Sequence, residues 1–140
     1  MYMVDSNIWA YYFDANLPEH KSVVSFLDPQ IISGNIAVST IIIVEVAHYL
    51  FKRLGSIEGF EKSNIFQLGQ FETLEFTSRD LDELLAIMKR VSHFGLGGRD
   101  VTILICMKKA GITRLVTHDQ SFRRIKDIEV IDPVVLDSLD

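Results

Sequence analysis

Four acidic residues are the strongest candidates for shared chemistry in this sequence: Asp5, Glu45, Asp100 and Asp119. Asp5 and Asp119 follow short apolar runs typical of strands, and Asp100 precedes the apolar run VTILICM. Glu45 interrupts the apolar stretch IIIVEVAHYLF. Holding two such charges about 4 Å apart costs roughly 4 kcal/mol at an effective dielectric constant of about 20. If these side chains meet, a cation must lie between them.

Carboxylate ligands select hard cations such as Mg²⁺ or Mn²⁺, which keep several waters and bind phosphate groups. The four histidines of the chain lack the spacing of a zinc site. A hard ion can deliver hydroxide, or an acid can position the attacking water, while the metal stabilises the oxyanion that leaves phosphorus. The four acids together therefore favour phosphodiester hydrolysis.

Each acid also has a purely structural interpretation. Aspartate is a favoured helix cap and turn residue, so any one of the three aspartates could serve the backbone alone. Glu45 lies in a helix that is apolar on nearly every side, so we expect this carboxylate to be buried. A buried carboxylate must pair, take up a proton or bind a cation. His48, one turn away, or Lys52 could be its partner.

The elements that must position these acids alternate along the chain. Strands are predicted at residues 2–4, 36–38, 73–76, 114–116 and 129–131, with gaps long enough for one or two helices. Three helices have recognisable caps: one from Thr40 to about Leu54, one from Thr77 and Asp80 to about Val91, and one from near Asp100 to Gly111. This pattern predicts an α/β fold with a mostly parallel sheet covered by helices. Ligands of such sheets bind beyond the carboxyl ends of the strands, where Asp5 and Asp119 are expected.

Length and composition indicate one domain spanning residues 1–140. The chain has 140 residues, of which 48% are hydrophobic and 24% charged, too few for two domains. Its longest apolar region, residues 36–51, is interrupted by polar side chains and falls short of the roughly 18 apolar residues of a membrane span. The start of the chain lacks the pattern of a signal peptide. We therefore expect a soluble protein. Its one cysteine, Cys106, cannot form an internal disulfide, which fits the expected cytoplasmic location but would fit other locations too.

The charge is unevenly distributed. Residues 89–126 contain nine basic and two acidic side chains, a local charge of +7. Because the net charge of the chain is −5, the other residues together carry −12. One phosphate-facing side would produce this asymmetry, although a solvated helix face would produce it too. Arg123 and Arg124, just after Asp119, are candidate phosphate contacts, with solvated charges as the alternative.

The acidic motifs, taken in order, resemble the PIN domain, most closely the VapC-type toxins of toxin and antitoxin pairs. The resemblance covers nearly the whole chain. Its three pieces are VDSN at residues 4–7, STIIIVE at residues 39–45, and RDVTILICMKKAGITRLVTHDQSF at residues 99–122. The helix after Asp100 departs from the family pattern by carrying Val, Thr and Cys where a run of Ala is usual, and His118 has no assigned role.

The resemblance implies a three-layer α/β/α fold with a central five-stranded parallel sheet, and a Mg²⁺- or Mn²⁺-dependent endoribonuclease. It implies that all four acids form the catalytic metal site. Asn7 and Thr117 would be polar supports, with Ser6 a weaker one. The implied partners are single-stranded or looped RNA, a cognate antitoxin and a second copy of the chain.

Other functions fit parts of the same pattern. The chain could be a PIN-fold RNA-processing nuclease outside a toxin system, or a module that binds RNA or protein without catalysis. A metallo-phosphatase or phosphoacceptor domain would use Asp5 as its nucleophile. The usual phosphatase signature has an acid two residues after that aspartate, where this chain has Asn7.

Overall fold

The computed structural model describes residues 1–136 and contains a five-stranded sheet in which all four pairings are parallel. Its strands are β1 (Tyr2–Val4), β2 (Ile36–Ser39), β3 (Glu72–Leu74), β4 (Arg114–Val116) and β5 (Glu129–Ile131). Their spatial order is β3-β2-β1-β4-β5. The predicted parallel α/β sheet is therefore confirmed.

Two strands differ from their predicted bounds. β2 extends by one residue to Ser39, and β3 covers residues 72–74, whereas 73–76 was predicted. The pairing explains the difference at β3, because Leu74 lies opposite Ser39, the last residue of β2. Beyond that point the chain finds no strand to pair with, and the Phe76 amide instead donates a hydrogen bond to the Thr40 hydroxyl at 3.3 Å.

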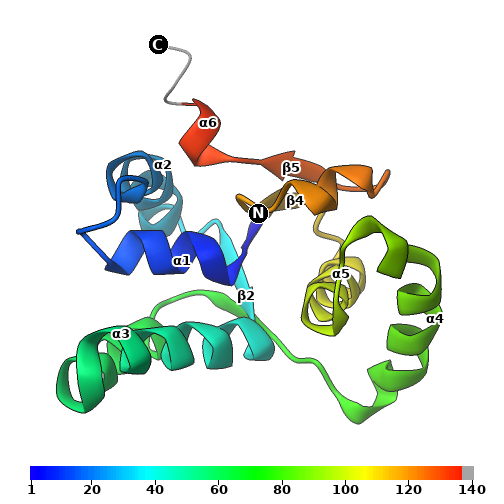
Figure 1. Cartoon of the computed structure of the whole chain (residues 1–140), viewed down its shortest axis with the longest axis horizontal. Coiled ribbons are helices and arrows are strands. Elements are labelled where there is room, and N and C mark those ends of the chain that lie inside the picture. Colours follow the sequence, from blue (N-terminus) through cyan, green and yellow to red (C-terminus); the bar gives the residue numbers. More distant parts are fainter. Residues whose placement is uncertain (137–140) are drawn as a thin grey trace.

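Helices cover both faces of the sheet and complete the three-layer architecture. The helices are α1 (Ser6–Phe13), α2 (His20–Ile32), α3 (Thr40–Gln67), α4 (Leu81–Val91), α5 (Gly98–Ala110) and α6 (Pro133–Leu136). Short 3₁₀ turns add η1 (Ser78–Asp80), η2 (Ser92–Phe94) and η3 (Gln120–Arg124). Figure 1 shows α1, α2 and α3 gathered on one side of the central strands and α4 and α5 on the other. Within residues 1–136, no helix has the length and apolar character needed to cross a membrane.

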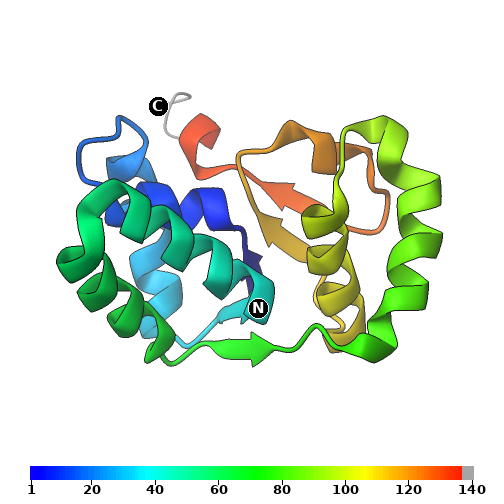
Figure 2. The same cartoon turned by 60° about the horizontal axis from the view of Figure 1, so that its bottom comes forward.

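Helix α3 departs most from its predicted form. Its cap is Ser39, whose hydroxyl accepts a hydrogen bond from the Ile42 amide at 3.1 Å, and the predicted cap, Thr40, is already the first helical residue. The helix breaks at Gly55, whose φ of 83° is left-handed, and then continues to Gln67. Figure 2 shows the second part folding back beside the first. The predicted end near Leu54 is thus the end of the first part only.

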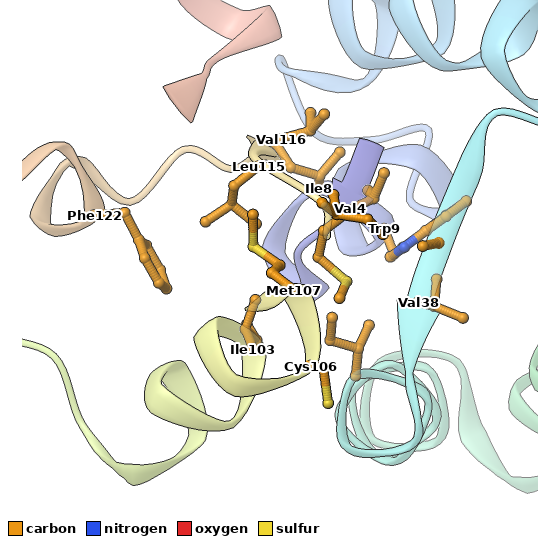
Figure 3. Packing of buried hydrophobic residues seen from close by; sticks show 14 of the residues in the cluster. Val4, Ile8, Trp9, Val38, Ile103, Cys106, Met107, Leu115, Val116 and Phe122 are labelled. Carbon is orange, nitrogen blue, oxygen red and sulfur yellow. The ribbon is translucent and has the colours of Figure 1, made fainter. Parts of the chain in front are cut away.

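The core forms where the central strands meet the helices. Met3, Val4, Leu115 and Val116, on β1 and β4, are fully buried. Figure 3 shows Ile8 and Trp9 of α1 and Met107 of α5 packed around these strands. The sheet order reverses between β1 and β4, so their carboxyl ends form the switch point where parallel sheets bind ligands. Val4 and Val116 lie opposite each other in this pairing, which brings the residues after them together.

Candidate metal centre

Asp5 is fixed at the end of β1 as the N-cap of α1. Its Oδ1 accepts a hydrogen bond from the Ser6 amide at 2.7 Å, and its Oδ2 accepts from the Thr117 hydroxyl at 2.7 Å and the Asn7 side-chain amide at 3.0 Å. The Ser6 hydroxyl is farther from Oδ1, at 3.5 Å. Asp5 therefore has both a capping role and a set of donors that hold its carboxylate in one orientation.

Thr117 connects this carboxylate to the chain after β4. The buried hydroxyl also accepts hydrogen bonds from the Asn7 side chain and the Asp119 amide, both at 3.1 Å. Asn7 Oδ1 in turn accepts from the His118 amide at 3.3 Å. The structure thus brings Asn7 and Thr117 together around Asp5, and the supporting role of these two residues stays a prediction.

Asp100 and Asp119 each cap a local turn through one oxygen. Asp100 Oδ2 accepts from the Gly97 amide at 2.8 Å at the start of α5. Asp119 Oδ1 accepts from the Ser121 amide at 2.8 Å before η3. For residues 1–136, the second oxygen of each carboxylate has no hydrogen bond to protein. A structural role and a ligand role are therefore compatible in both residues.

Glu45 pairs with a residue that the sequence analysis did not consider. Its Oε1 lies 2.9 Å from Nη1 of Arg99, rather than in contact with His48 or Lys52. The expected burial is also wrong, because the Glu45 side chain is 17% exposed and Val44 beside it is 66% exposed. Sequence periodicity could not reveal this pair, since Arg99 follows in the chain by more than fifty residues. Only the packing of α3 against α5 brings the two together.

The four candidate acids line one cavity of about 540 Å³. They come from the ends of β1 and β4, from α3 and from the start of α5, and Ser6, Asn7 and Gly97 to Arg99 complete the wall. Arg99 is the one basic residue among these lining side chains. Among the described residues, no three Asp, Glu, His or Cys side chains are yet grouped closely enough to enclose a metal ion.

The surroundings of the cavity disfavour the ionised form of its carboxylates. Burial, with smaller contributions from the charges of Asp100 and Glu45, outweighs the lowering effect of the bonds from Thr117 and Ser6 and raises the pKa of Asp5 to about 6. Burial also raises the pKa of Asp100, with a contribution from Asp119, against the lowering effect of the Gly97 amide. The ionised site is therefore short of positive charge, and the donor set, which consists of carboxylate oxygens, suits a hard divalent cation.

His118 belongs to a second polar network beside the site. Its Nδ1 lies 2.9 Å from Oδ2 of Asp132, a buried residue directly after β5, and the Gln120 side-chain amide donates to the same oxygen at 2.9 Å. Asp132 was not among the residues predicted from the sequence, although an aspartate just after a strand repeats the pattern of Asp5. This contact between His118 and Asp132 holds the chain segment between β4 and Asp119 in place, so His118 helps to position Asp119.

Arg123 and Arg124 lie on η3 but do not line the acidic cavity. Arg123 Nε donates to the Gln120 side chain at 2.5 Å, and the Arg124 guanidinium lies 5.7 Å from the centre of the Phe94 ring. Arg124 instead lines a separate cavity between α4, α5 and the segment before β5. A phosphate contact by either arginine stays a prediction.

The comparisons with known proteins agree with this architecture. A family model described as the PIN domain matches residues 2–128. Mycobacterium tuberculosis VapC20, a sarcin-ricin loop cleaving toxin, has 19% identity and a TM-score of 0.76 over 93% of this chain and 98% of its own. A chain of VapBC2 from Rickettsia felis, bound to a promoter DNA fragment, has 22% identity and a TM-score of 0.72 over 94% and 97%.

A third similar structure is FitAcB from Neisseria gonorrhoeae, with 17% identity and a TM-score of 0.72 over 95% of this chain and 98% of the other. At such identities the likeness concerns the fold. No curated protein sequence matches the chain.

Proposed function

The chain belongs to the PIN domain family, and from this premise we propose that it is a Mg²⁺- or Mn²⁺-dependent endoribonuclease that hydrolyses RNA phosphodiester bonds. One observation carries the proposal: Asp5, Glu45, Asp100 and Asp119, from four separate segments, line one cavity at the switch point of the sheet. A protein that only binds RNA gains nothing from placing four carboxylates where phosphates must approach.

The residues that would hold the metal are the same four acids. Mg²⁺ or Mn²⁺ there would supply the positive charge that lowers the pKa of a coordinated water and stabilises the charge developing on phosphate. Asp5, held by Thr117, Asn7 and the Ser6 amide, is already oriented. Glu45 must leave Arg99, a pairing that costs little to break because the Arg99 side chain is 78% exposed.

The chain's own groups also arrange the surroundings of the reaction. The second oxygens of Asp100 and Asp119 are available to orient an attacking water by hydrogen bonding, while their first oxygens keep them attached to backbone amides. Thr117 is hydrogen-bonded to both Asp5 and the Asp119 amide, so it holds two of the acids in a fixed relation.

We further propose that the protein is the toxin of a VapBC-type pair, acting in the cytoplasm as a homodimer with a cognate antitoxin. Similar folds occur in a toxin that cleaves the sarcin-ricin loop and in a VapBC2 complex bound to promoter DNA. The buried, unpaired Cys106 suits a reducing compartment. These likenesses support the assignment through the fold.

An RNA cleavage assay tests the proposed activity. Total RNA and a stem-loop containing the sarcin-ricin sequence are incubated with the protein and Mn²⁺, and the new ends are mapped. We expect defined cuts that EDTA abolishes and that Asp119→Asn reduces at least about 100-fold. Asp127→Asn, which neutralises an exposed acid outside the cavity, is the control and should leave the rate unchanged. Equal cleavage by Asp119→Asn and the control would contradict the proposal.

A further inference from the structure

A second cavity, of about 690 Å³, adjoins the acidic one between α1 and α3. The two share Ser6, Asn7, Glu45 and Arg99. Beyond the shared residues, the second cavity is lined by three residues with rings, Tyr11, His48 and Tyr49, and by the apolar Val44. We name it the tyrosine groove. Because the cavities share four residues, a ligand phosphate at the acidic site would have its next nucleotide at the groove.

The lining of the tyrosine groove differs in chemistry from that of the acidic cavity. Glu45 is its one carboxylate among the lining residues, and this carboxylate is already paired with Arg99. Apart from Glu45, Arg99 and His48, the residues that line the groove are aromatic, aliphatic or neutral polar. Aromatic faces stack on nucleobases with little regard to sequence. The volume suits one small-molecule-sized group and excludes a duplex, so the chemistry favours a single unpaired nucleotide.

The two tyrosines are anchored in their positions. The Tyr49 hydroxyl donates to Asp14 Oδ2 at 3.1 Å, and Arg53 Nε holds the same oxygen at 2.9 Å. The backbone carbonyl oxygen of Tyr11 lies 2.8 Å from Nδ1 of His20. The Tyr11 ring meets the His118 ring edge-on, with ring centroids 6.0 Å apart. Rings held in this way lose little freedom when a base packs against them.

Arg99 lies at the junction of the two cavities and is the one arginine or lysine that lines either of them. A guanidinium is suited to paired hydrogen bonds with phosphate oxygens. Among the described residues, the Arg99 guanidinium makes one ion pair, with the half-buried Glu45, which is also a candidate metal ligand. A cation that takes Glu45 frees Arg99, so metal binding and the availability of Arg99 are coupled through one carboxylate.

We propose that the tyrosine groove is the subsite for the unpaired nucleotide next to the cleaved phosphate, and that Arg99 binds the phosphate of that nucleotide. The inference rests on the proposed nuclease function. Arg99 would then have opposite effects on the binding of two ligands. It weakens metal binding by competing for Glu45, and it strengthens nucleotide binding by contacting the phosphate.

Adenosine 3′-monophosphate and adenosine 5′-monophosphate are the probes, since neither contains a diester bond to cleave. Each is titrated into ¹⁵N-labelled protein with Mg²⁺ and followed by amide chemical shifts. We expect the largest shifts at Tyr11, His48, Tyr49 and Arg99. Arg99→Gln should weaken binding about tenfold, and His48→Ala about threefold. The matched controls are Arg79→Gln and His93→Ala, which alter exposed residues outside both cavities and should bind as wild type does.

Mn²⁺ calorimetry supplies the second readout. Arg99→Gln should bind Mn²⁺ at least as tightly as wild type, because the guanidinium no longer competes for Glu45. If Arg99 merely supported the fold, Arg99→Gln would weaken the binding of both Mn²⁺ and the nucleotide. Absence of nucleotide binding, shifts centred on another surface, or unchanged nucleotide affinity in Arg99→Gln would overturn the proposal. If wild type binds Mn²⁺ and cuts RNA while Arg99→Gln binds the nucleotide as tightly as wild type does, only the role of the tyrosine groove as a nucleotide subsite is rejected. If wild type neither binds Mn²⁺ nor cuts RNA, the nuclease function itself is rejected.

Discussion

At the scale of single residues, Asp5 shows how the site trades stability for ligand affinity. Three donors orient its carboxylate, yet burial still raises its pKa to about 6. The ionised form is thus less favourable in the folded protein than in the unfolded chain, where the pKa is about 3.9. A raised carboxylate pKa is what a cation site would show when no cation is bound, because the cation would supply the positive charge that stabilises the ionised carboxylate.

This pKa predicts the pH dependence of stability without metal. Because the folded state binds the proton more tightly, the stability contributed by Asp5 is present below about pH 4 and is lost as pH rises to about 6. The loss amounts to about 3 kcal/mol. Urea unfolding in EDTA should therefore show wild type losing stability relative to Asp5→Asn between pH 4 and 6.

The variant comparison isolates Asp5 from other acids. Asp14 and Asp80 have pKa values lowered mainly by Arg53 and Lys109, so their stabilisation is lost as pH falls, in a more acidic range. Asp127→Asn should reproduce the wild-type profile. If the stability difference between wild type and Asp5→Asn does not change with pH over this range, Asp5 is not desolvated as described.

At the scale of elements, the folded-back helix α3 supports the site from a distance. Its first part carries Glu45, and its second part brings Phe66 against Trp9 of α1, with ring centroids 4.7 Å apart. The close approach of the two parts depends on Gly59. A Cβ atom there would lie 2.7 Å from Cα of Phe51, a backbone atom that cannot move aside cheaply.

Gly59→Ala should therefore destabilise the protein by about 1–3 kcal/mol, despite the higher helix propensity of alanine. The free energy of unfolding in urea measures the effect. Gly98→Ala is the matched control, since its added Cβ would meet Met88 at an ordinary 3.8 Å, and we expect a change within about 0.5 kcal/mol. Equal stability of the two variants would show that the parts of α3 are not packed as described.

The elements also show what the sequence could predict. β1, β4 and β5 have the predicted bounds, and Gly111 ends α5, because short apolar runs and a left-handed glycine are local signals. The return of α3 after Gly55 was missed, since its second part is broken from the first and exposes Ile57 and Ile65. Such a segment has no clear periodicity to detect.

At the scale of the whole molecule, the basic stretch and the acidic site separate. Residues 89–126 include the end of α4 and all of η2, α5, β4 and η3, yet Arg99 is the one arginine or lysine from this stretch that lines the acidic cavity. The nearness of Asp5 and Asp119 could be expected from their places after strands of one parallel sheet, whereas the convergence of all four acids was expected only from the resemblance of their motifs to the PIN domain. The pairs Arg99 with Glu45 and His118 with Asp132 were not predictable, because each joins elements that only the complete fold brings together.

Calorimetric titration of Mn²⁺ into the whole protein shows whether four acids distant in sequence form one metal site. We expect saturable binding that Asp100→Asn weakens at least about tenfold and that Asp127→Asn leaves unchanged. A cavity that binds Mn²⁺ equally well in wild type and Asp100→Asn, or not at all, would contradict the claim and leave these carboxylates as helix caps and ion-pair partners.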